Sequence, residues 1–383
     1  MALRIGGKLG KWLFNFLTKR KQQVVISGEK SSVTNVTSGV PQGAVLGPIL
    51  FLIYISDIGE NISPMKKIYV DDTKVKKPIK NVEDVESLQL DLTKLYEWAK
   101  SNNMVFNGTK FQVVRYGQNE ELKEDTLYFT EDTGDIIERF DKLRDLGVIL
   151  NEEATFSDHI QHVEKKVRQK IGWVLRTFYT RNAGFMKILY KSLIVPHVDY
   201  CSQLWMPIQA TQIQSIEKLQ KDFLNKIPAV RELNYWEQLK QLKMISLQRR
   251  LERYTVLYVW KILEGLSPNC GIEVKMEGGR LGRTCSIPSR NSKAKASVQS
   301  MREQTFQVNG PKLFNSLPTK LRNMTKCPLE DFKLALDNYL SKIPDEPNVS
   351  GLTPGGCTAE ARASNSILDQ SKRIPPTGHG IGG

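Results

Sequence analysis

The chain has 383 residues, of which 40% are hydrophobic and 25% charged, and its formal net charge is +14 at pH 7. This length and apolar content allow a buried core in two or three structural units and exclude wholesale disorder. The positive charge favours a polyanionic partner, because Lys and Arg gain affinity for phosphates by releasing condensed counterions. The alternative is a solvated basic surface. No apolar run is long enough to span a bilayer.

Residues 1–28 contain no Asp or Glu, and their apolar residues recur at helical spacing, at Leu9, Trp12, Leu13, Phe16 and Leu17. A basic amphipathic helix of this kind can serve as an organelle-targeting segment. Because it runs into the strand-like residues 23–26 without a small-residue cleavage pattern, we expect a folded helix instead. A loop punctuated by Gly and Pro then opens an apolar helix before residue 60.

Residues 65–75 predict a β-hairpin. Apolar strand-forming residues lead into Asp71 and Asp72, and the chain leaves through Thr73 and Val75, so the two acids lie at the tip. Side chains alternate along a strand, so Tyr69 and Asp71 point one way and Asp72 the other. Carboxylates at a strand end suit hard cations and phosphoryl transfer, although Asp-Asp is also a common turn sequence. A helix follows, with helical spacing at Val85, Leu88, Leu92, Leu95 and Trp98.

Residues 151–268 read as mostly helical, with amphipathic stretches around 157–180, 184–195, 211–226 and 236–264 and with Pro196 and Pro207 as breakers. His159 and His162 are spaced to share a metal on one helix face, but we expect a helix face near water. Gly, Ser, Lys and Arg accumulate in residues 269–305, which predicts a basic linker. We expect a small structured element at 306–345 and a disordered tail at 346–383. The five cysteines are widely spaced, which favours reduced thiols inside a cell.

Two motifs in this order resemble a known family. Ser38-Gly-Val-Pro-Gln-Gly43 before the apolar helix, and then Tyr69-Val-Asp-Asp72, look like the B and C motifs of reverse transcriptases from non-LTR retrotransposons, jockey-like elements in particular. Residues 98–110 resemble the D region and 143–148 the E motif, called the primer grip. Segments within 159–220, at 247–250 and at 310–318 resemble the thumb and the region beyond it. The resemblance covers roughly residues 8–345.

The resemblance implies an α+β fold, in which residues 1–150 form an incomplete right-hand polymerase palm and 151–268 a mostly α-helical thumb, followed by a C-terminal helical region. It implies an RNA-directed DNA polymerase that transfers nucleotides with two Mg²⁺ or Mn²⁺ ions. The partners would be an RNA template, the RNA/DNA hybrid, DNA and deoxynucleoside triphosphates, without a membrane. Such a protein would work in the cytoplasm and the nucleus.

The same resemblance assigns site residues. Asp71 and Asp72 would be the catalytic, metal-binding carboxylates. Pro41, Gln42 and Gly43 would contact template and nucleotide, as would Lys110, for which a plain surface lysine is the alternative. Leu146, Gly147 and Val148 would contact the primer end. The basic residues that would face the duplex backbone are Lys165, Lys166, Arg168, Lys170, Arg176 and Arg181, while Trp173 and Phe178 would belong to the thumb core.

One part of the family's catalytic apparatus has no counterpart in these residues. The chemistry needs a further Asp from an A-motif strand ahead of the B motif, and the one acidic residue before Ser38 is Glu29, in a turn-like stretch. Asp57 follows the apolar helix and is misplaced for this task. We therefore expect no polymerase activity from this chain alone. The alternatives are a non-enzymatic basic protein that binds nucleic acid and a decayed retroelement remnant.

Overall fold

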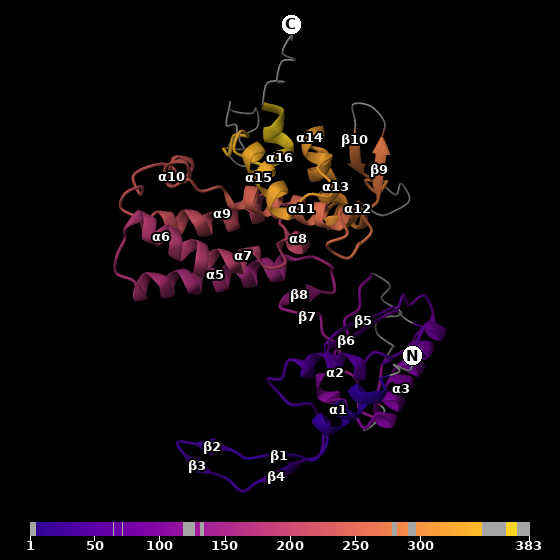
Figure 1. Cartoon of the computed structure of the whole chain (residues 1–383). Coiled ribbons are helices and arrows are strands. Elements are labelled where there is room, and N and C mark those ends of the chain that lie inside the picture. Colours follow the sequence, from indigo (N-terminus) through magenta and orange to yellow (C-terminus); the bar gives the residue numbers. More distant parts are fainter. Residues whose placement is uncertain are drawn as a thin grey trace. The chain divides into compact units, whose positions relative to one another are not determined.

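The computed structural model describes residues 5–63, 65–70, 72–117, 127–130, 134–277, 282–289, 296–346 and 365–373. The chain divides into two compact units, Met1–Phe140 and Asp141–Gly383 (Figure 1). The described residues form helices and five two-stranded antiparallel sheets, which is an α+β fold as predicted. Within these residues, no helix combines the length and the apolar character that crossing a membrane requires.

The first unit begins with helix α1 (Gly7–Leu17), which confirms the predicted amphipathic helix, although none of its residues is buried. A two-stranded arm follows, in which β1 (Arg20–Gln22) pairs with β4 (Thr34–Val36) and β2 (Val25–Ile26) pairs with β3 (Glu29–Lys30). At the base of the arm the Arg20 guanidinium donates to the carbonyl oxygens of Leu17, Ser38 and Gly39. Arg20 therefore ties the arm to the loop that follows it.

The remaining elements of the first unit are the apolar helix α2 (Leu46–Tyr54), the hairpin β5 (Met65–Tyr69) and β6 (Asp72–Lys76), the long helix α3 (Val82–Ser101) and the short turn η1 (Gly108–Lys110). The predicted hairpin and the predicted helix over residues 85–98 are thereby confirmed. The core of this unit is small, because its buried cluster consists of Val85, Tyr128 and Ile137 with partly buried neighbours.

Polar contacts, more than apolar burial, hold the β5–β6 hairpin in the first unit. The Lys66 ammonium donates to the carbonyl oxygens of Ile58 and Gly59, at 3.2 and 2.6 Å. Ser63, just before β5, donates through its hydroxyl to the carboxylate of Asp91 on α3, at 2.9 Å. Burial would raise the pKa of Asp91, but the hydrogen bonds from Ser63 and Lys94 outweigh it and lower that pKa. The charged carboxylate thus joins the hairpin to α3.

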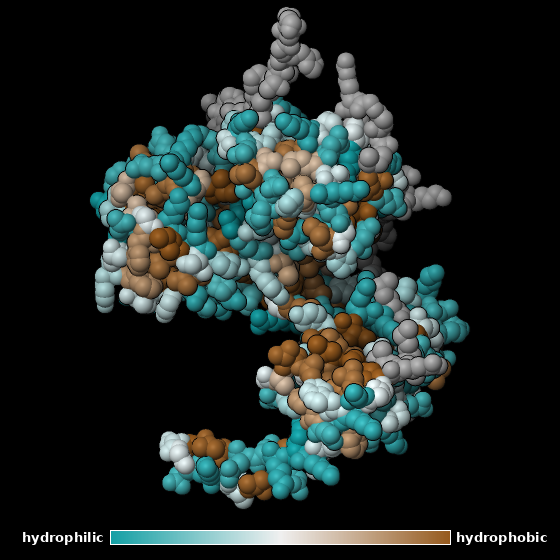
Figure 2. All heavy atoms as spheres, viewed as in Figure 1, coloured by the Kyte–Doolittle hydropathy of each residue, from teal (hydrophilic) through white to brown (hydrophobic). Residues whose placement is uncertain are grey.

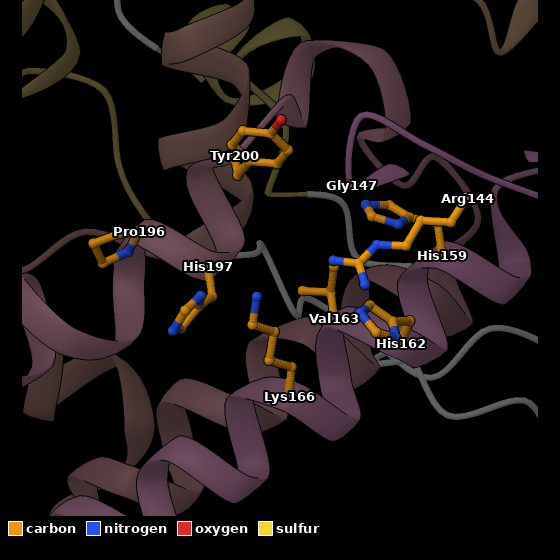
Figure 3. Close-up of a pocket in the computed structure, with 9 residues that line it drawn as sticks. All are labelled: Arg144, Gly147, His159, His162, Val163, Lys166, Pro196, His197 and Tyr200. Carbon is orange, nitrogen blue, oxygen red and sulfur yellow. The ribbon is translucent and has the colours of Figure 1, made fainter. Parts of the chain in front are cut away.

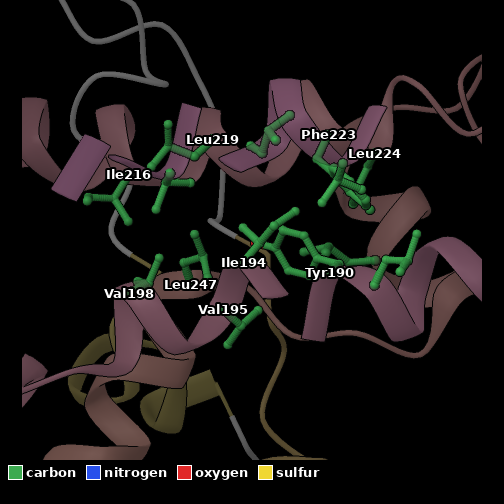
Figure 4. Packing of buried hydrophobic residues seen from close by; sticks show 14 of the residues in the cluster. Tyr190, Ile194, Val195, Val198, Ile216, Leu219, Phe223, Leu224 and Leu247 are labelled. Atoms are coloured by element: carbon green, nitrogen blue, oxygen red, sulfur yellow. The ribbon is translucent and has the colours of Figure 1, made fainter. Parts of the chain in front are cut away.

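The second unit opens with the hairpin β7 (Lys142–Asp145) and β8 (Val148–Asn151), which we had grouped with the preceding region. A helical bundle follows it, made of α5 (Ser157–Thr177), α6 (Ala183–Leu189), α7 (Val195–Asp199), α8 (Ser202–Trp205), α9 (Ala210–Leu224) and α10 (Tyr235–Leu242). Its core interleaves aliphatic side chains with aromatic rings, among them Tyr190, Ile194, Ile216, Phe223 and Leu247 (Figure 4).

Pro196 does not break the helical path, contrary to our prediction. A π turn over Tyr190–Ile194 joins α6 to α7, and the Val195 N–H donates to the Tyr190 carbonyl five residues back. Proline lacks the N–H of a regular helix, and its ring clashes with a carbonyl of the preceding turn. The wider π turn ends two residues before the proline, which lies in the first turn of α7.

Helix α11 (Leu247–Leu263) is the central helix of the second unit. Our single stretch over 236–264 is two helices, since Lys243 adopts a left-handed conformation and Ser246 caps α11. The first half of α11 belongs to the bundle core and the second half to another core, shared with α13 (Phe306–Asn315), α14 (Thr319–Arg322) and α15 (Leu329–Leu340). There Trp260 stacks on Phe332 with ring centroids 4.6 Å apart.

The predicted basic linker at 269–305 is a folded element in its described residues. It contains the hairpin β9 (Val274–Glu277) and β10 (Gly282–Cys285) and helix α12 (Ala296–Glu303). The buried Arg283 guanidinium donates to the Glu264 carboxylate at 2.6 Å, and the Cys285 N–H donates to the Asn315 side chain at 2.8 Å. The linker prediction was wrong because these partners lie 19 and 30 residues away in sequence.

The predicted disorder of residues 346–383 was also wrong for the nine residues of this tail from 365 to 373. They form α16 (Ile367–Gln370) and a 3-10 turn (Ser371–Arg373). Ile367 is fully buried in the second core, and its N–H donates to the Glu252 carboxylate at 2.7 Å. The buried Arg249 guanidinium donates to the carbonyl oxygens of Pro344 and Asn365. Composition alone does not indicate these long-range partners.

Shortening the chain tests this C-terminal packing. A chain that ends at Glu346 loses the burial of Ile367 and the hydrogen bonds to Arg249 and Glu252, so we expect its free energy of unfolding to fall by about 2–4 kcal/mol. The measurement is urea denaturation followed by tryptophan fluorescence. A chain that ends at Arg373 is the control and should unfold like the full chain. Equal midpoints for all three chains would show that residues 365–373 add no stability.

Glu252 predicts a pH dependence of stability. Burial raises the pKa of its carboxyl to about 7, against the lowering effect of the Ile367 N–H, the Ser366 side chain and the Arg249 charge. Since the folded pKa exceeds the unfolded value, this contribution to stability is complete below about pH 4.5 and is lost as pH rises through about 7. We expect Glu252→Gln to remove about 1–3 kcal/mol of the difference in unfolding free energy between pH 5.5 and 8. Urea midpoints at both pH values test this, with the exposed Glu330→Gln as control; an unchanged pH slope in Glu252→Gln would contradict it.

Candidate functional site

The tip of the β5–β6 hairpin carries the described carboxylate of the C motif. Tyr69 pairs with Asp72 as the last pair of the ladder, so their side chains share one face, contrary to the opposite directions that we expected, and both are exposed. Val70 lies between them with φ +56°. A β-branched residue in this left-handed region costs about 1–3 kcal/mol, and such strain concentrates at functional sites. Asp71, the other predicted carboxylate, lies outside the described residues.

The loop with Pro41, Gln42 and Gly43 packs over the start of α2. Gly43 has φ +81°, which favours glycine, and the Ala44 N–H donates to the Pro41 carbonyl at 3.4 Å. A Cβ atom on Gly47 would lie 3.0 Å from this same carbonyl oxygen, so only glycine fits there without a shift of the backbone. Gln42 and Gly43 are exposed and Pro41 is half-buried. The loop therefore presents Gln42 and the backbone of Gly43 to solvent.

Lys110 ends the short η1 turn with an exposed side chain. This exposure agrees with the alternative of a plain surface lysine. Contact of Lys110 with nucleotide stays a prediction.

Helix α2 exposes an apolar surface in the first unit. Val45, at its start, is 88% exposed, and Ile49, Leu52 and Tyr54 are also exposed. Figure 2 shows hydrophobic side chains gathered over this part of the first unit. An exposed apolar patch of this kind marks an interaction surface.

The predicted primer grip is the two-residue turn of the β7–β8 hairpin. Leu146 and Gly147 both have positive φ, and Tyr200 donates its hydroxyl to the Leu146 carbonyl at 2.6 Å. A Cβ atom on Gly147 would lie 3.3 Å from the Tyr200 ring. Leu146 exposes its side chain, whereas Val148 is buried. Of the three predicted residues, Leu146 alone therefore offers a solvent-facing side chain.

The first turn of α5 holds this hairpin. Asn151 on β8 donates to the Asp158 carboxylate at 2.9 Å, and Lys142 on β7 donates to it at 3.1 Å. These two hydrogen bonds lower the pKa of Asp158. The Ile149 N–H donates to His159 Nδ1 at 3.2 Å. The turn that bears Leu146 is thus fixed to the helix that carries the predicted basic tract.

Helix α5 displays part of this basic tract on one face. At 100° per residue, Lys165 and Arg176 point in nearly the same direction, and both are exposed. Lys166 is exposed beside them. The Lys170 ammonium lies over the Trp173 ring, 4.6 Å from its centroid. Trp173 is 42% exposed, so our assignment of it to the thumb core was wrong, whereas Phe178 packs against the core as predicted.

Two arginines of the predicted tract have protein partners. Arg181 donates to the carbonyl oxygens of Leu175, Phe178 and Thr180, which would otherwise be unsatisfied where α5 ends. It acts as a cap, a role that its spacing from the other cations did not reveal. Arg168 lies 3.5 Å from Asp222 on α9 and 3.9 Å from Glu164. The cations of α5 without an acidic partner in the described structure are therefore Lys165, Lys166, Lys170 and Arg176.

The described residues contain no group of three or more His, Cys, Asp or Glu side chains placed to hold a metal ion. His159 and His162 stack with ring centroids 6.4 Å apart, and no third ligand joins them. His159 is buried at 2% exposure, so our expectation of a helix face near water was wrong for this residue.

Comparison with known proteins agrees with these motifs. Residues 2–169 match the family described as "Reverse transcriptase (RNA-dependent DNA polymerase)". The chain is 27% identical to the "RNA-directed DNA polymerase from mobile element jockey" of Drosophila melanogaster over 226 residues, which is 56% of this chain and 24% of that protein. The jockey protein of Drosophila funebris is 29% identical, over 56% of this chain and 24% of its own length.

A third relative is the "Probable RNA-directed DNA polymerase from transposon X-element" of Drosophila melanogaster, 27% identical over 54% of this chain and 24% of that protein. The chain thus spans about a quarter of the length of these relatives. No solved structure matches it significantly. Residues 2–169 are thus similar to reverse transcriptases, and the chain resembles the enzymes of non-LTR retrotransposons over about half of its length.

Proposed function

We propose that this chain is a portion of a non-LTR reverse transcriptase that acts in RNA-directed DNA synthesis. In this proposal residues 1–150 contribute part of the polymerase palm and residues 151–268 the thumb. The observation that carries it is the exposed hairpin tip with Asp72 and the strained Val70, within a segment that matches the reverse transcriptase family. The protein would work where its RNA and target DNA meet, in the cytoplasm and the nucleus.

The proposed roles follow the family resemblance and the local geometry. Asp71 and Asp72 would supply carboxylates at the hairpin tip, and Gln42 with the Gly43 backbone would face template and incoming deoxynucleotide. An exposed glycine lets a base or sugar approach the backbone closely. The Leu146 side chain would contact the primer end. Support for this last role comes from the bonds that fix its turn to Tyr200 and α5.

A divalent cation, Mg²⁺ or Mn²⁺, belongs to the chemistry of such polymerases, but the described residues do not fit a complete site for it. Asp72 is exposed and has no second described carboxylate beside it in a metal-binding group. Glu29, the acidic residue that precedes the B motif, lies on β3 of the exposed arm. In this proposal a metal binds at Asp71 and Asp72 only when another segment or chain supplies a further carboxylate.

Binding of an RNA/DNA hybrid is the part of the proposal that the second unit supports. Lys165 and Arg176 lie about three turns apart on one exposed face of α5, with the half-exposed Trp173 close to that face. Cations along a helix face neutralise successive phosphates of a nucleic-acid backbone. This same face also favours the second candidate function, a non-enzymatic protein that binds nucleic acid.

The hybrid-binding test removes two cations of α5. We expect Lys165→Gln/Arg176→Gln to weaken binding of a fluorescein-labelled RNA/DNA hybrid and to lower the slope of log K against log[KCl] by about 0.8 for each lost phosphate contact. Fluorescence anisotropy from 50 to 300 mM KCl measures both quantities. Lys320→Gln, an exposed lysine on α14, is the control and should behave as the unchanged chain. An unchanged slope in the double variant would contradict the proposed hybrid face.

Primer extension tests whether the chain catalyses nucleotide incorporation. We expect the 383-residue chain to incorporate no nucleotide on poly(rA)/oligo(dT) with Mg²⁺ or Mn²⁺, because removing one member of a catalytic group that acts as a unit costs orders of magnitude in rate. Incorporation that disappears in Asp71→Ala would overturn this expectation and establish the chain as a complete polymerase. Hybrid binding without incorporation would agree with a binding portion that needs its catalytic complement.

A further inference from the structure

A pocket of about 310 Å³ lies in the second unit, beside the β7–β8 turn. Its walls come from three elements: Arg144 on β7, His159, His162 and Lys166 on α5, and His197 on α7, with the Tyr200 ring and Gly147 at its edge (Figure 3). None of the residues that line it is acidic. Arg144 and Lys166 form no ion pair with any residue in the described parts of the chain.

The buried His159 lines the pocket and carries a ring nitrogen without a hydrogen-bond partner. Its Nδ1 accepts the Ile149 N–H, so the neutral ring is assigned its proton on Nε2. His159 is 2% exposed, and no described group accepts this Nε2–H. Burial and the charges of His162 and Arg144 lower the pKa of His159 to about 4, so the ring stays neutral near pH 7. A buried donor without a partner is uncommon in a folded protein.

The other two histidines of the pocket respond to the same positive field. Burial and the nearby Arg144, Lys166 and Lys165 lower the pKa of His162. Burial and the positive charges of Lys166 and Lys170 lower the pKa of His197. Cations that crowd together without an acid are stabilised by an anion, and an anion between them would raise both pKa values.

We propose that this pocket holds one phosphate group of a nucleic-acid strand. The inference rests on the proposed function and deepens it, since it names the group that the region beside Leu146 and Gly147 recognises. A phosphodiester group fits a pocket that offers cationic donors and no acidic side chain, because its oxygens only accept hydrogen bonds. A backbone phosphate, more than a free ion, is indicated because the exposed cations of α5 continue from Lys166 to Arg176 on the same helix.

The pocket would bind a backbone phosphate more tightly as pH falls. Protonation of His162 and His197 adds positive charge, while Arg144, Lys165, Lys166 and Lys170 keep theirs and His159 stays neutral until about pH 4. Affinity for a backbone phosphate, whose own charge does not change in this range, should therefore rise as pH is lowered from 8 to 6.

Histidine NMR tests the proposal on the full chain. The sequence has four histidines, and three of them line the pocket, so ¹⁵N-histidine labelling gives few signals. The fourth, His379, lies outside the described residues and is the reference. At constant ionic strength we expect inorganic phosphate, and separately a short RNA/DNA hybrid, to shift the three pocket signals and to raise the pKa values of His162 and His197. His379 should stay unchanged.

Matched variants separate the pocket from the open helix face. Lys166→Gln and Arg144→Gln should weaken the phosphate titration by about tenfold, whereas Lys165→Gln, a neighbouring lysine outside the pocket, should change it by about twofold at most. His159→Gln keeps a distal N–H donor and His159→Asn does not, so the Asn variant should bind phosphate more weakly. Should both His159 variants fail to fold, the Lys166 and Arg144 variants still decide the matter.

Three outcomes would overturn the inference. Pocket signals that move with neither inorganic phosphate nor hybrid would remove the site. Signals that move with phosphate and not with hybrid would make it a free-anion site. In a third outcome, hybrid binding loses its salt dependence in Lys165→Gln/Arg176→Gln but is unchanged in Lys166→Gln and Arg144→Gln. The proposed function would then stand, but the strand would bind outside this pocket.

Discussion

The second unit depends on the hydrogen bonds that the buried guanidinium of Arg249 donates. Arg249 is 1% exposed and reaches the carbonyl oxygens of Ile343, Pro344 and Asn365, which lie 94 to 116 residues later in the chain. A buried charge without partners costs several kcal/mol, so α11 requires these C-terminal segments to fold against it. Arg250 and Arg253 on the same helix form paired bonds to Asp199 and Asp337. One helix thereby connects the bundle core, the second core and the C-terminal residues.

The two units differ in how they are stabilised. The second has two large apolar cores, and the turn beside Tyr200 is fixed to it through Asn151, Asp158 and His159. The first has one small cluster and relies on polar contacts such as Ser63 to Asp91. It leaves α2 exposed. In the proposed function, the second unit positions nucleic acid, and the first unit carries the carboxylates.

Local patterns in the sequence predicted local structure well. The spacing around Val85 and Leu95 predicted α3, and strand-forming residues around two acids predicted the β5–β6 hairpin. The errors arose where distant partners decide the outcome. Arg283 needs Glu264, and Ile367 needs Glu252, so composition alone suggested a linker and a disordered tail. The pocket joins residues of three separate segments, and the Arg181 cap depends on carbonyl groups freed where α5 ends. Neither leaves a periodic signal.

The two-stranded β5–β6 hairpin has a consequence for ligand affinity. Its ladder ends at Tyr69 and Asp72, and within the described residues no third strand joins it. Two-stranded hairpins gain little stability from their own ladder, and Val70 adds strain to this one. Apparent affinity falls in proportion to the fraction of molecules whose tip is in the binding-competent form. A partner strand that pairs with the hairpin without touching the ligand would strengthen ligand binding, because it would bring all molecules into the binding-competent form.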